Sequence, residues 1–246
     1  MTGGKGRANG CGLCFLAQGF RYLSQDEGKG GQMCGRFLMT QPNDALARMF
    51  DAVPDNDLPM GPRNNICPTQ SVAVVTAGRR LQAMRWGFIP SWYAAPAQGP
   101  LIINARADTI ATKPAFRDAV RARRCIIPAV GFYEWSAGDG GARLPWLITR
   151  SDGALMAFAG IWQAWQGAAT CAMVTVDAGP GLAAIHHREP VILDPADWAL
   201  WLGEAGHGAA PLMVAQGLGV LQSHRVSPAV NSNRAEGAAL IEPFEG

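Results

Sequence analysis

The chain lacks the features that mark a membrane-spanning, exported or nucleotide-hydrolysing protein. Its 246 residues contain no run of about 20 apolar residues, the length that a helix needs to cross a bilayer. The apolar stretch at residues 11–20 is short, and no small-x-small cleavage site follows it, so no export signal is predicted. A glycine-rich Walker loop is absent, which argues against nucleotide hydrolysis. We expect a cytoplasmic protein with no membrane partner.

Residues that bind metals are sparse as well. The chain has six cysteines and four histidines, and no second Cys/His pair lies near Cys11-x-x-Cys14. A structural zinc site needs four ligands, and a redox CxxC motif needs a thioredoxin-like βαβ setting, which this sequence does not predict. Without an export signal, six cysteines in a chain of this size indicate a reducing compartment. We expect no metal site and no cofactor.

Charged residues are few, and lysine is rare among them. Only 16% of the residues are charged, and 18 of the 21 basic residues are arginines. The net charge of +2 lies entirely in residues 1–32, and residues 33–246 balance at zero. Attraction of the whole chain to nucleic acid is therefore not predicted. Local contacts with phosphate remain open, because the planar fork of arginine suits that group.

The composition predicts one folded domain of short elements. Residues 1–32 are glycine-rich and nearly aperiodic, so we interpret them as a disordered extension or a mis-called translation start, and residues 33–246 as a single domain. Periodicity and turn signals predict strands at 71–76 and 81–86 (a hairpin), 125–128, 131–135, 146–149, 155–161 and 171–176. Short helices are predicted at 45–50, 113–123 and 195–202, the last capped by Asp194. This pattern indicates an α+β fold with a mainly antiparallel, barrel-like core.

Four polar clusters interrupt the apolar background, and each contributes one candidate catalytic residue: Cys34, Asn104, Glu134 and His186. A thiol, a histidine, a carboxylic acid and a polar amide suffice for Cys–His chemistry. Taken singly, each residue also fits a structural role, such as a core cysteine or a hydrogen-bonded histidine. Glu134 is the least ordinary, because burial between Tyr133 and Trp135 would raise its pKa and suit it to general acid catalysis.

Seven motifs occur in order along most of residues 33–246. They are MCGRF at 33–37, NICPTQ at 65–70, WGFIPSW at 86–92, INARADT at 103–109, RCIIPAVGFYEW at 124–135, IHHREPVIL at 185–193 and V-x-x-x-V-N at 226–231. With this series the chain resembles the SOS response-associated peptidase (SRAP) family of abasic-site processing proteins. Seven motifs in order are far more specific than any one of them.

The resemblance implies covalent capture of an abasic site in single-stranded DNA, the expected partner. Removal of the initiator Met would make Cys34 the first residue, and its amine and thiol would join the sugar aldehyde in a thiazolidine. By resemblance, Asn104 would position the amine and the sugar, Glu134 would relay a proton, and His186 would act on the deoxyribose oxygen. Arg106 would hold a flanking phosphate. We expect a protein that acts as a monomer and becomes nucleoid-associated on DNA.

DNA binding also requires phosphate contacts and stacking faces. We predict these roles for six residues: Arg36, Arg85, Arg106, Trp86, Trp92 and Arg188. The arginines at 117–124 fit a solvated helix face equally well. Two departures from the family pattern are Asp108, where Glu is usual, and Glu189, which replaces Met; a carboxylate at 189 would weaken DNA binding if it faced the bound phosphates.

The 32 residues before Met33 are the main departure from the family. An internal Cys34 has an amide nitrogen, so it cannot form the cross-link. Either translation starts at Met33, or the protein cleaves itself when the Cys34 thiol attacks the Met33 carbonyl, a peptidase (hydrolase) activity. A lyase activity at the lesion is a further expectation, since a Schiff base activates β-elimination. Two other hypotheses stay open: a Cys–His peptidase acting on proteins, and a non-catalytic single-strand DNA-binding module.

Overall fold

The computed structural model describes residues 35–55 and 57–245, which form thirteen strands and three α-helices. The strands are β1 (Arg36–Met39), β2 (Val53–Pro54), β3 (Arg63–Ile66), β4 (Ser71–Thr76), β5 (Arg80–Trp86), β6 (Asn104–Arg106), β7 (Arg124–Ala129), β8 (Gly131–Ala137), β9 (Arg143–Arg150), β10 (Met156–Trp165), β11 (Ala168–Asp177), β12 (Arg188–Pro190) and β13 (Leu221–Arg225). The helices are α1 (Asn43–Met49), α2 (Arg117–Ala122) and α3 (Trp198–Leu202). The expected extension at 1–32 lies outside the described residues.

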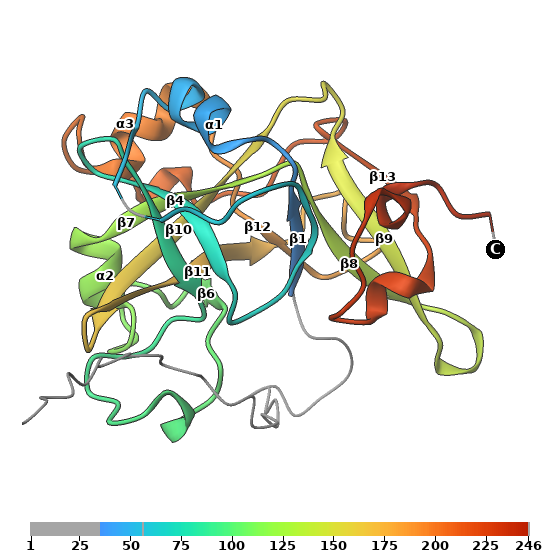
Figure 1. Ribbon diagram of the computed structural model, residues 1–246, viewed down its shortest axis with the longest axis horizontal. Coiled ribbons are helices and arrows are strands. Elements are labelled where there is room, and N and C mark those ends of the chain that lie inside the picture. The colour runs from blue at the N-terminus through green and yellow to red at the C-terminus, as the bar shows by residue number, and fades with distance from the viewer. Residues whose placement is uncertain (1–34, 56, 246) are drawn as a thin grey trace, which may run out of the picture.

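The larger sheet closes on itself through a parallel contact (Figure 1). Its order is β12-β11-β10-β7-β4-β5-β2, and β11 also pairs with β5, with Thr170 opposite Arg85 and Cys171 opposite Trp86. Strands β4, β5, β11, β10 and β7 therefore form a ring around apolar side chains such as Phe158. The expectation of a mainly antiparallel, barrel-like α+β fold is confirmed.

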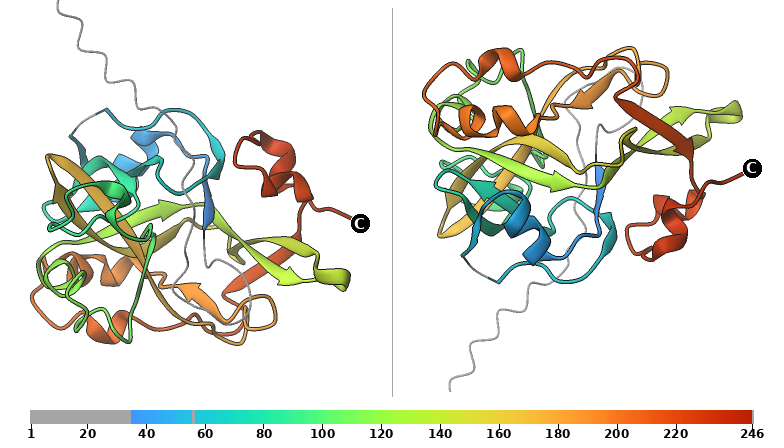
Figure 2. Two further views of the ribbon diagram at one scale, coloured as in Figure 1. Left: turned by 90° about the horizontal axis from the view of Figure 1, so that it is seen from below. Right: turned by 90° about the horizontal axis from the view of Figure 1, so that it is seen from above.

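A second sheet of order β13-β9-β8-β1-β3 lies against this ring, and Figure 2 shows its β8–β9 hairpin projecting from the rest of the molecule. Successive side chains of a strand point to opposite faces. Along β8, Phe132 packs in the main core, whereas Tyr133 packs in a smaller core with Leu38, Leu147 and three residues of the C-terminal segment. Strand β8 therefore separates two cores.

The predicted hairpin at 71–76 and 81–86 is confirmed, as is the first helix, but the other two helices differ from expectation. Helix α2 begins at Arg117 rather than Lys113, because the residues around Pro114 form a separate turn in which the Phe116 amide donates to the Lys113 carbonyl. Asp194 precedes a 3-10 turn, and its side chain caps neither that turn nor α3. In the described ranges, no helix is long and apolar enough to cross a bilayer.

Glu189 on β12 is a buried structural carboxylate. Its two oxygens accept hydrogen bonds from the amides of Gly179 at 2.9 Å and Gln216 at 2.5 Å. With 1% of its surface exposed, it points away from solvent, so the concern that it repels phosphate does not arise. It fixes two loops to the strand that follows His186.

Replacement of Gly131 by Ala is expected to destabilise the fold, because the new methyl group would lie 2.6 Å from the backbone oxygen of Ile148. Backbone cannot move aside cheaply, so we expect a loss of about 1–3 kcal/mol in the free energy of unfolding. Urea denaturation measures it. The control is Gly181→Ala, whose methyl group meets nothing within 4 Å and should change stability by less than about 0.5 kcal/mol.

The stability contributed by Glu189 should depend on pH. Burial raises the pKa of this carboxyl, while the hydrogen bonds from the Gln216 and Gly179 amides oppose the rise. A raised pKa makes the folded chain bind the proton more tightly than the unfolded chain, so stability is lost as pH rises through the folded-state pKa. We expect the stability of wild type relative to Glu189→Gln to fall as the pH rises above about 4.3, the ordinary pKa of glutamate, in urea titrations; a constant or rising difference would contradict this.

Candidate functional site

Two of the four candidate catalytic residues meet in the structure. Glu134 lies on β8, and His186 ends the turn that leads into β12; the distance from Glu134 Oε1 to His186 Nδ1 is 3.8 Å. Both side chains are buried, with only 1% of the glutamate side chain exposed. A carboxylate and an imidazole this close, in a site of low dielectric, can exchange a proton or stabilise each other's charge.

The backbone fixes the position of His186. Its own amide donates to the Leu182 carbonyl at 3.0 Å. Its Nδ1 atom lies 3.2 Å from both the amide and the carbonyl oxygen of Arg188. The neutral imidazole can accept from that amide, and a protonated Nδ1 can donate to that oxygen. The ring is therefore held in place in both protonation states.

Asn104 and Arg106 lie on β6, which runs parallel to β11, with Asn104 opposite Met173 and Arg106 opposite Thr175. The same end of β11 pairs with β12, where Arg188 lies opposite Asp177. Three segments that are distant in sequence are thus grouped around one strand end. The motifs at 103–109 and 185–193 are far apart in the sequence, and the folded barrel brings their strands together on β11.

Arg106 carries its guanidinium at the surface, paired with Asp108. The distance between Arg106 Nη2 and Asp108 Oδ2 is 2.9 Å, and both side chains are more than a third exposed. The hydrogen bond from Arg106 lowers the pKa of Asp108; slight burial opposes this, and the charge of Arg188 adds to the lowering. Exposed ion pairs of this kind contribute little stability, so an incoming phosphate could displace the carboxylate at small cost.

Arg36 does not point to solvent as a phosphate ligand would. Its guanidinium donates to Asn65 Oδ1 at 2.9 Å and to the Val230 carbonyl at 2.7 Å, with further bonds to the carbonyls of Asn231 and Ser232. Asn65 in turn donates to the Ser232 carbonyl at 2.9 Å. This network joins three of the sequence motifs and anchors β1. The expected phosphate contact by Arg36 does not fit this placement.

Cys34 lies outside the described residues, whereas strand β1, which begins two residues later, lies within them. In the antiparallel pair β1–β8, Arg36 lies opposite Tyr133 and Phe37 opposite Phe132. The chain direction therefore carries Gly35, the residue bonded to Cys34, alongside Glu134.

Two more residues expected to bind DNA are enclosed by protein. Trp86 is fully buried in the barrel, where its Nε1 donates to the Ile103 carbonyl at 3.1 Å. Arg188 is 2% exposed, and its guanidinium bonds to Asp177 and to the Thr175 carbonyl. Neither placement fits a stacking face or a phosphate contact, because no surface of these groups is open to a strand. Their roles are to fill the barrel and to bind β12 to β11.

Trp92 and Arg85 lie nearer the surface. Trp92 is 56% exposed and has Tyr93 against its edge, with ring centroids 6.2 Å apart, so it can accept a stacked base. Arg85 is half-buried and donates to the Gly87 carbonyl at 2.7 Å. Of the cluster at 117–124, Arg124 is bound to protein carbonyls, including Val120 at 2.9 Å, and Arg117 is exposed beside Asp118. His187 is exposed.

The sequence reasoning missed Trp135 and Asn231 as partners. The Trp135 indole donates to Asn231 Oδ1 at 2.7 Å, and the Arg143 guanidinium lies 5.0 Å from the indole ring centroid. Alternation along β8 was the available signal, because it places Trp135 on the face opposite to Glu134. Tyr133 shares that face, and burial, with the charge of Glu236, raises the pKa of its hydroxyl, which donates to the Asn64 carbonyl at 2.7 Å.

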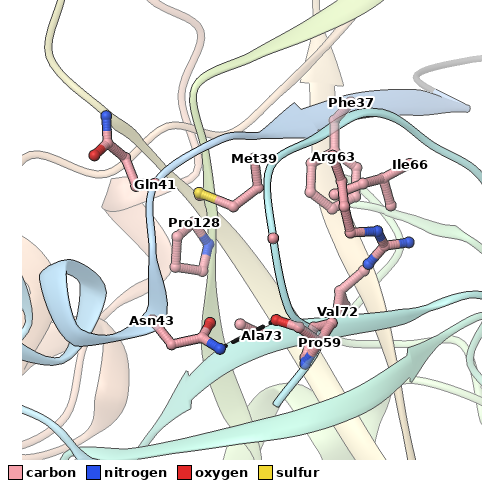
Figure 3. Close-up of a pocket in the computed structure, with 11 residues that line it drawn as sticks. Phe37, Met39, Gln41, Asn43, Pro59, Arg63, Ile66, Val72, Ala73 and Pro128 are labelled. Atoms are coloured by element: carbon pink, nitrogen blue, oxygen red, sulfur yellow. Dashed lines mark hydrogen bonds between the residues drawn. The ribbon is translucent and has the colours of Figure 1, made fainter. Parts of the chain in front are cut away.

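A small cavity lies between β1, α1 and β3 (Figure 3). Its volume of about 20 Å³ is enough for roughly one water molecule. Asn43 and Pro59 close one side through a hydrogen bond of 3.1 Å, and Phe37, Met39 and Arg63 line the other. The cavity is too small for a nucleotide, and neither Glu134 nor His186 lines it. Within residues 35–55 and 57–245, no group of three acidic, histidine or cysteine side chains is placed to hold a metal ion.

Comparison with known proteins agrees with this architecture and with the sequence motifs. The family model described as SOS response associated peptidase (SRAP) matches residues 33–233. The chain is 36% identical to "Abasic site processing protein YoaM" of Bacillus subtilis over 85% of its length and 98% of that protein. It is 31% identical to "Abasic site processing protein YedK" of Escherichia coli over 86% and 100% of the two chains.

A crystal structure of a protein from Bacteroides thetaiotaomicron has a similar fold. The TM-score is 0.76 at 22% identity, with 86% of this chain and all of the other covered. At that identity the likeness concerns the fold alone. The ordered motifs, the family model and the relatives together show that this chain belongs to the SRAP family.

Proposed function

We propose that this protein senses abasic sites in single-stranded DNA and shields them by a covalent cross-link through Cys34. The observation that carries the proposal is the buried Glu134–His186 pair, 3.8 Å apart, beside the strand that follows Cys34. The relatives' printed names, abasic site processing protein, support the substrate. The cross-link itself, the single-strand preference and action as a monomer are parts of the proposal.

The chemistry depends on a free amine at Cys34. An α-amine has a pKa of about 7.7–8.0, so a useful fraction is neutral and nucleophilic near neutral pH. Its nitrogen attacks the aldehyde carbon of the ring-opened sugar, and water leaves as the imine forms. The thiol sulfur then adds to the imine carbon, and the thiol proton passes to the nitrogen. The resulting five-membered thiazolidine needs no oxidant and no cofactor.

Each of the other candidate residues has one role in this proposal. Glu134 donates a proton to the departing hydroxyl during imine formation, and His186 exchanges a proton with the sugar oxygen. Asn104 orients the amine and the sugar. Arg106 exchanges its surface carboxylate partner, Asp108, for a DNA phosphate. Trp92 and Arg85 extend the DNA contact, whereas the positions of Trp86, Arg36 and Arg188 suit structural support.

Release of the Cys34 amine requires removal of everything before it. Translation from Met33 followed by loss of Met33 would suffice. Alternatively, the Cys34 thiol attacks the Met33 carbonyl, the peptide nitrogen leaves as the free amine of Cys34 after protonation, and water hydrolyses the acyl group. A lyase reaction that follows the imine would be a side activity of the same site.

Substitution of Cys34 tests the proposal directly. Incubation of the protein with single-stranded DNA that holds one abasic site should give an adduct stable in SDS. Cys34→Ala should abolish this adduct, because the thiol is missing. Cys34→Ala and Cys34→Ser both retain the amine, so borohydride should still trap their imines. Intact mass shows whether residue 34 is the first residue, and a preparation that keeps residues 1–33 should form no adduct. An undiminished spontaneous adduct from Cys34→Ala would overturn the proposal.

Glu134→Gln should slow cross-linking by about 10²–10⁴-fold, the usual contribution of a positioned general acid. The shape of the side chain is kept, so the loss is in the rate and not in the fold. Single-turnover adduct formation measures the rate, and thermal melting monitors the fold. The matched control is Glu242→Gln, which removes a negative charge from an exposed position in the C-terminal segment and should keep the wild-type rate. Equal rates for Glu134→Gln and wild type would remove Glu134 from the mechanism.

A further inference from the structure

A row of three cross-strand neighbours extends from Glu134 to the edge of the second sheet. Glu134 on β8 lies opposite Trp146 on β9, and Trp146 lies opposite Arg225 on β13. Directly opposed residues in antiparallel strands share one face of the sheet, with Cβ atoms about 4.5–5.5 Å apart. Arg225 is therefore two strand spacings, about 10 Å, from the strand of Glu134.

This row lies on the same side of the sheet as His186. Phe132 and Ile148, which alternate in phase with Glu134 and Trp146, belong to the main core, and Trp146 packs against that core. Tyr133 and Leu147, which have the opposite phase, belong to the smaller core. The contact between Glu134 and His186 confirms that this face is the one directed toward the site.

Local contacts fix both Trp146 and Arg225. The Trp146 indole donates to Ser136 Oγ at 2.9 Å, and the Arg225 guanidinium lies 5.5 Å from the centroid of the indole ring. Arg225 Nε donates to the Pro145 carbonyl at 3.3 Å. The tryptophan side chain has only two rotatable bonds, so its ring is a rigid surface for the guanidinium. The ring contact and the hydrogen bond to Pro145 leave the Arg225 side chain little conformational freedom.

The outer edge of the Arg225 guanidinium has no protein acceptor among residues 35–55 and 57–245. Its one hydrogen bond in these ranges uses Nε, and none of their ion pairs includes it. The other arginines of the site are occupied, Arg36 and Arg188 by carbonyls and Asp177, and Arg106 by Asp108. A half-buried, oriented guanidinium with two terminal nitrogens available fits the bidentate geometry of a phosphate.

We propose that Arg225, held over the ring of Trp146, binds the backbone phosphate of a nucleotide next to the abasic site. Trp146 is a positioning residue in this arrangement, since it acts through Arg225. The assignment rests on the proposed function for the identity of the bound strand. A separation of about 10 Å between the strands of Glu134 and Arg225 is on the scale of one or two nucleotides.

The test is equilibrium binding to single-stranded DNA that carries one tetrahydrofuran abasic analogue. This probe has no aldehyde, so binding is measured without cross-linking. Arg225→Gln should weaken binding about three- to tenfold at low salt. It should also reduce the slope of log Kd against log salt by about 0.7, the value for one phosphate contact on a single strand. Arg225→Lys keeps the charge and should restore the slope, but not the full affinity.

Two further variants separate positioning from folding. Trp146→Leu removes the ring and should reproduce most of the loss seen with Arg225→Gln, whereas Trp146→Phe keeps an aromatic face and should bind nearly as wild type. Arg48→Gln removes the same charge from exposed α1, far from β13 in Figure 1, and should leave the slope unchanged. Melting temperatures identify any variant that fails to fold. If a Trp146 variant does not fold, the comparison of Arg225→Gln with Arg225→Lys tests the proposal by itself.

The two proposals fail in different ways. Wild-type affinity and slope in Arg225→Gln, while the wild-type protein still cross-links natural abasic DNA, would overturn the role of Arg225 and leave the proposed function intact. A reduced slope in Arg225→Gln, together with an undiminished spontaneous adduct from Cys34→Ala, would keep the phosphate contact and overturn the cross-linking chemistry.

Discussion

The alternation of side chains along β8 is the constraint on which the site depends. Phe132 and Glu134 face the barrel, while Tyr133 and Trp135 face the C-terminal segment. A shift of the pairing by one residue would exchange the two sets. The register is therefore fixed, because Phe132 must be buried in one core and Tyr133 in the other. This register places the carboxyl group of Glu134 beside His186. His186 gives this buried carboxyl group a polar partner, and packing on both faces of β8 holds the strand that carries it.

Several polar residues that resemble ligands in the sequence form the frame around the site. Arg36 and Asn65 tie β1 and β3 to the C-terminal segment, and Arg188 ties β12 to β11. Each donates hydrogen bonds to backbone carbonyls of the segments that it joins. These bonds hold the strands that carry the candidate catalytic groups. The same sequence motifs therefore contain both the structural residues and the candidate catalytic residues.

The sequence predicted what local patterns determine. The hairpin β4–β5 follows from alternating residues and a turn, and the short helix α1 lies close to the predicted range 45–50, although no side chain caps it. Closure of the barrel by β5 and β11 is a long-range event, and no local pattern encodes it. The candidate residues Glu134 and His186 came from motif recognition, but their contact depends on that closure. Burial of Trp86 was missed for the same reason, since a motif position does not reveal which face is covered.

Closure of the barrel also bears on how the chain reaches its folded state. The parallel contact joins Arg85 to Thr170, and the segments that carry Asn104, Glu134 and His186 lie between these strands or directly after them. Pairings between residues so distant in sequence form slowly, because closing the long loop costs conformational entropy before the stabilising contacts have formed. During synthesis, β12 and the turn that carries His186 emerge after β8 and β11. The polar groups of the site therefore assemble only when the barrel is nearly complete, and an incomplete chain lacks their arrangement.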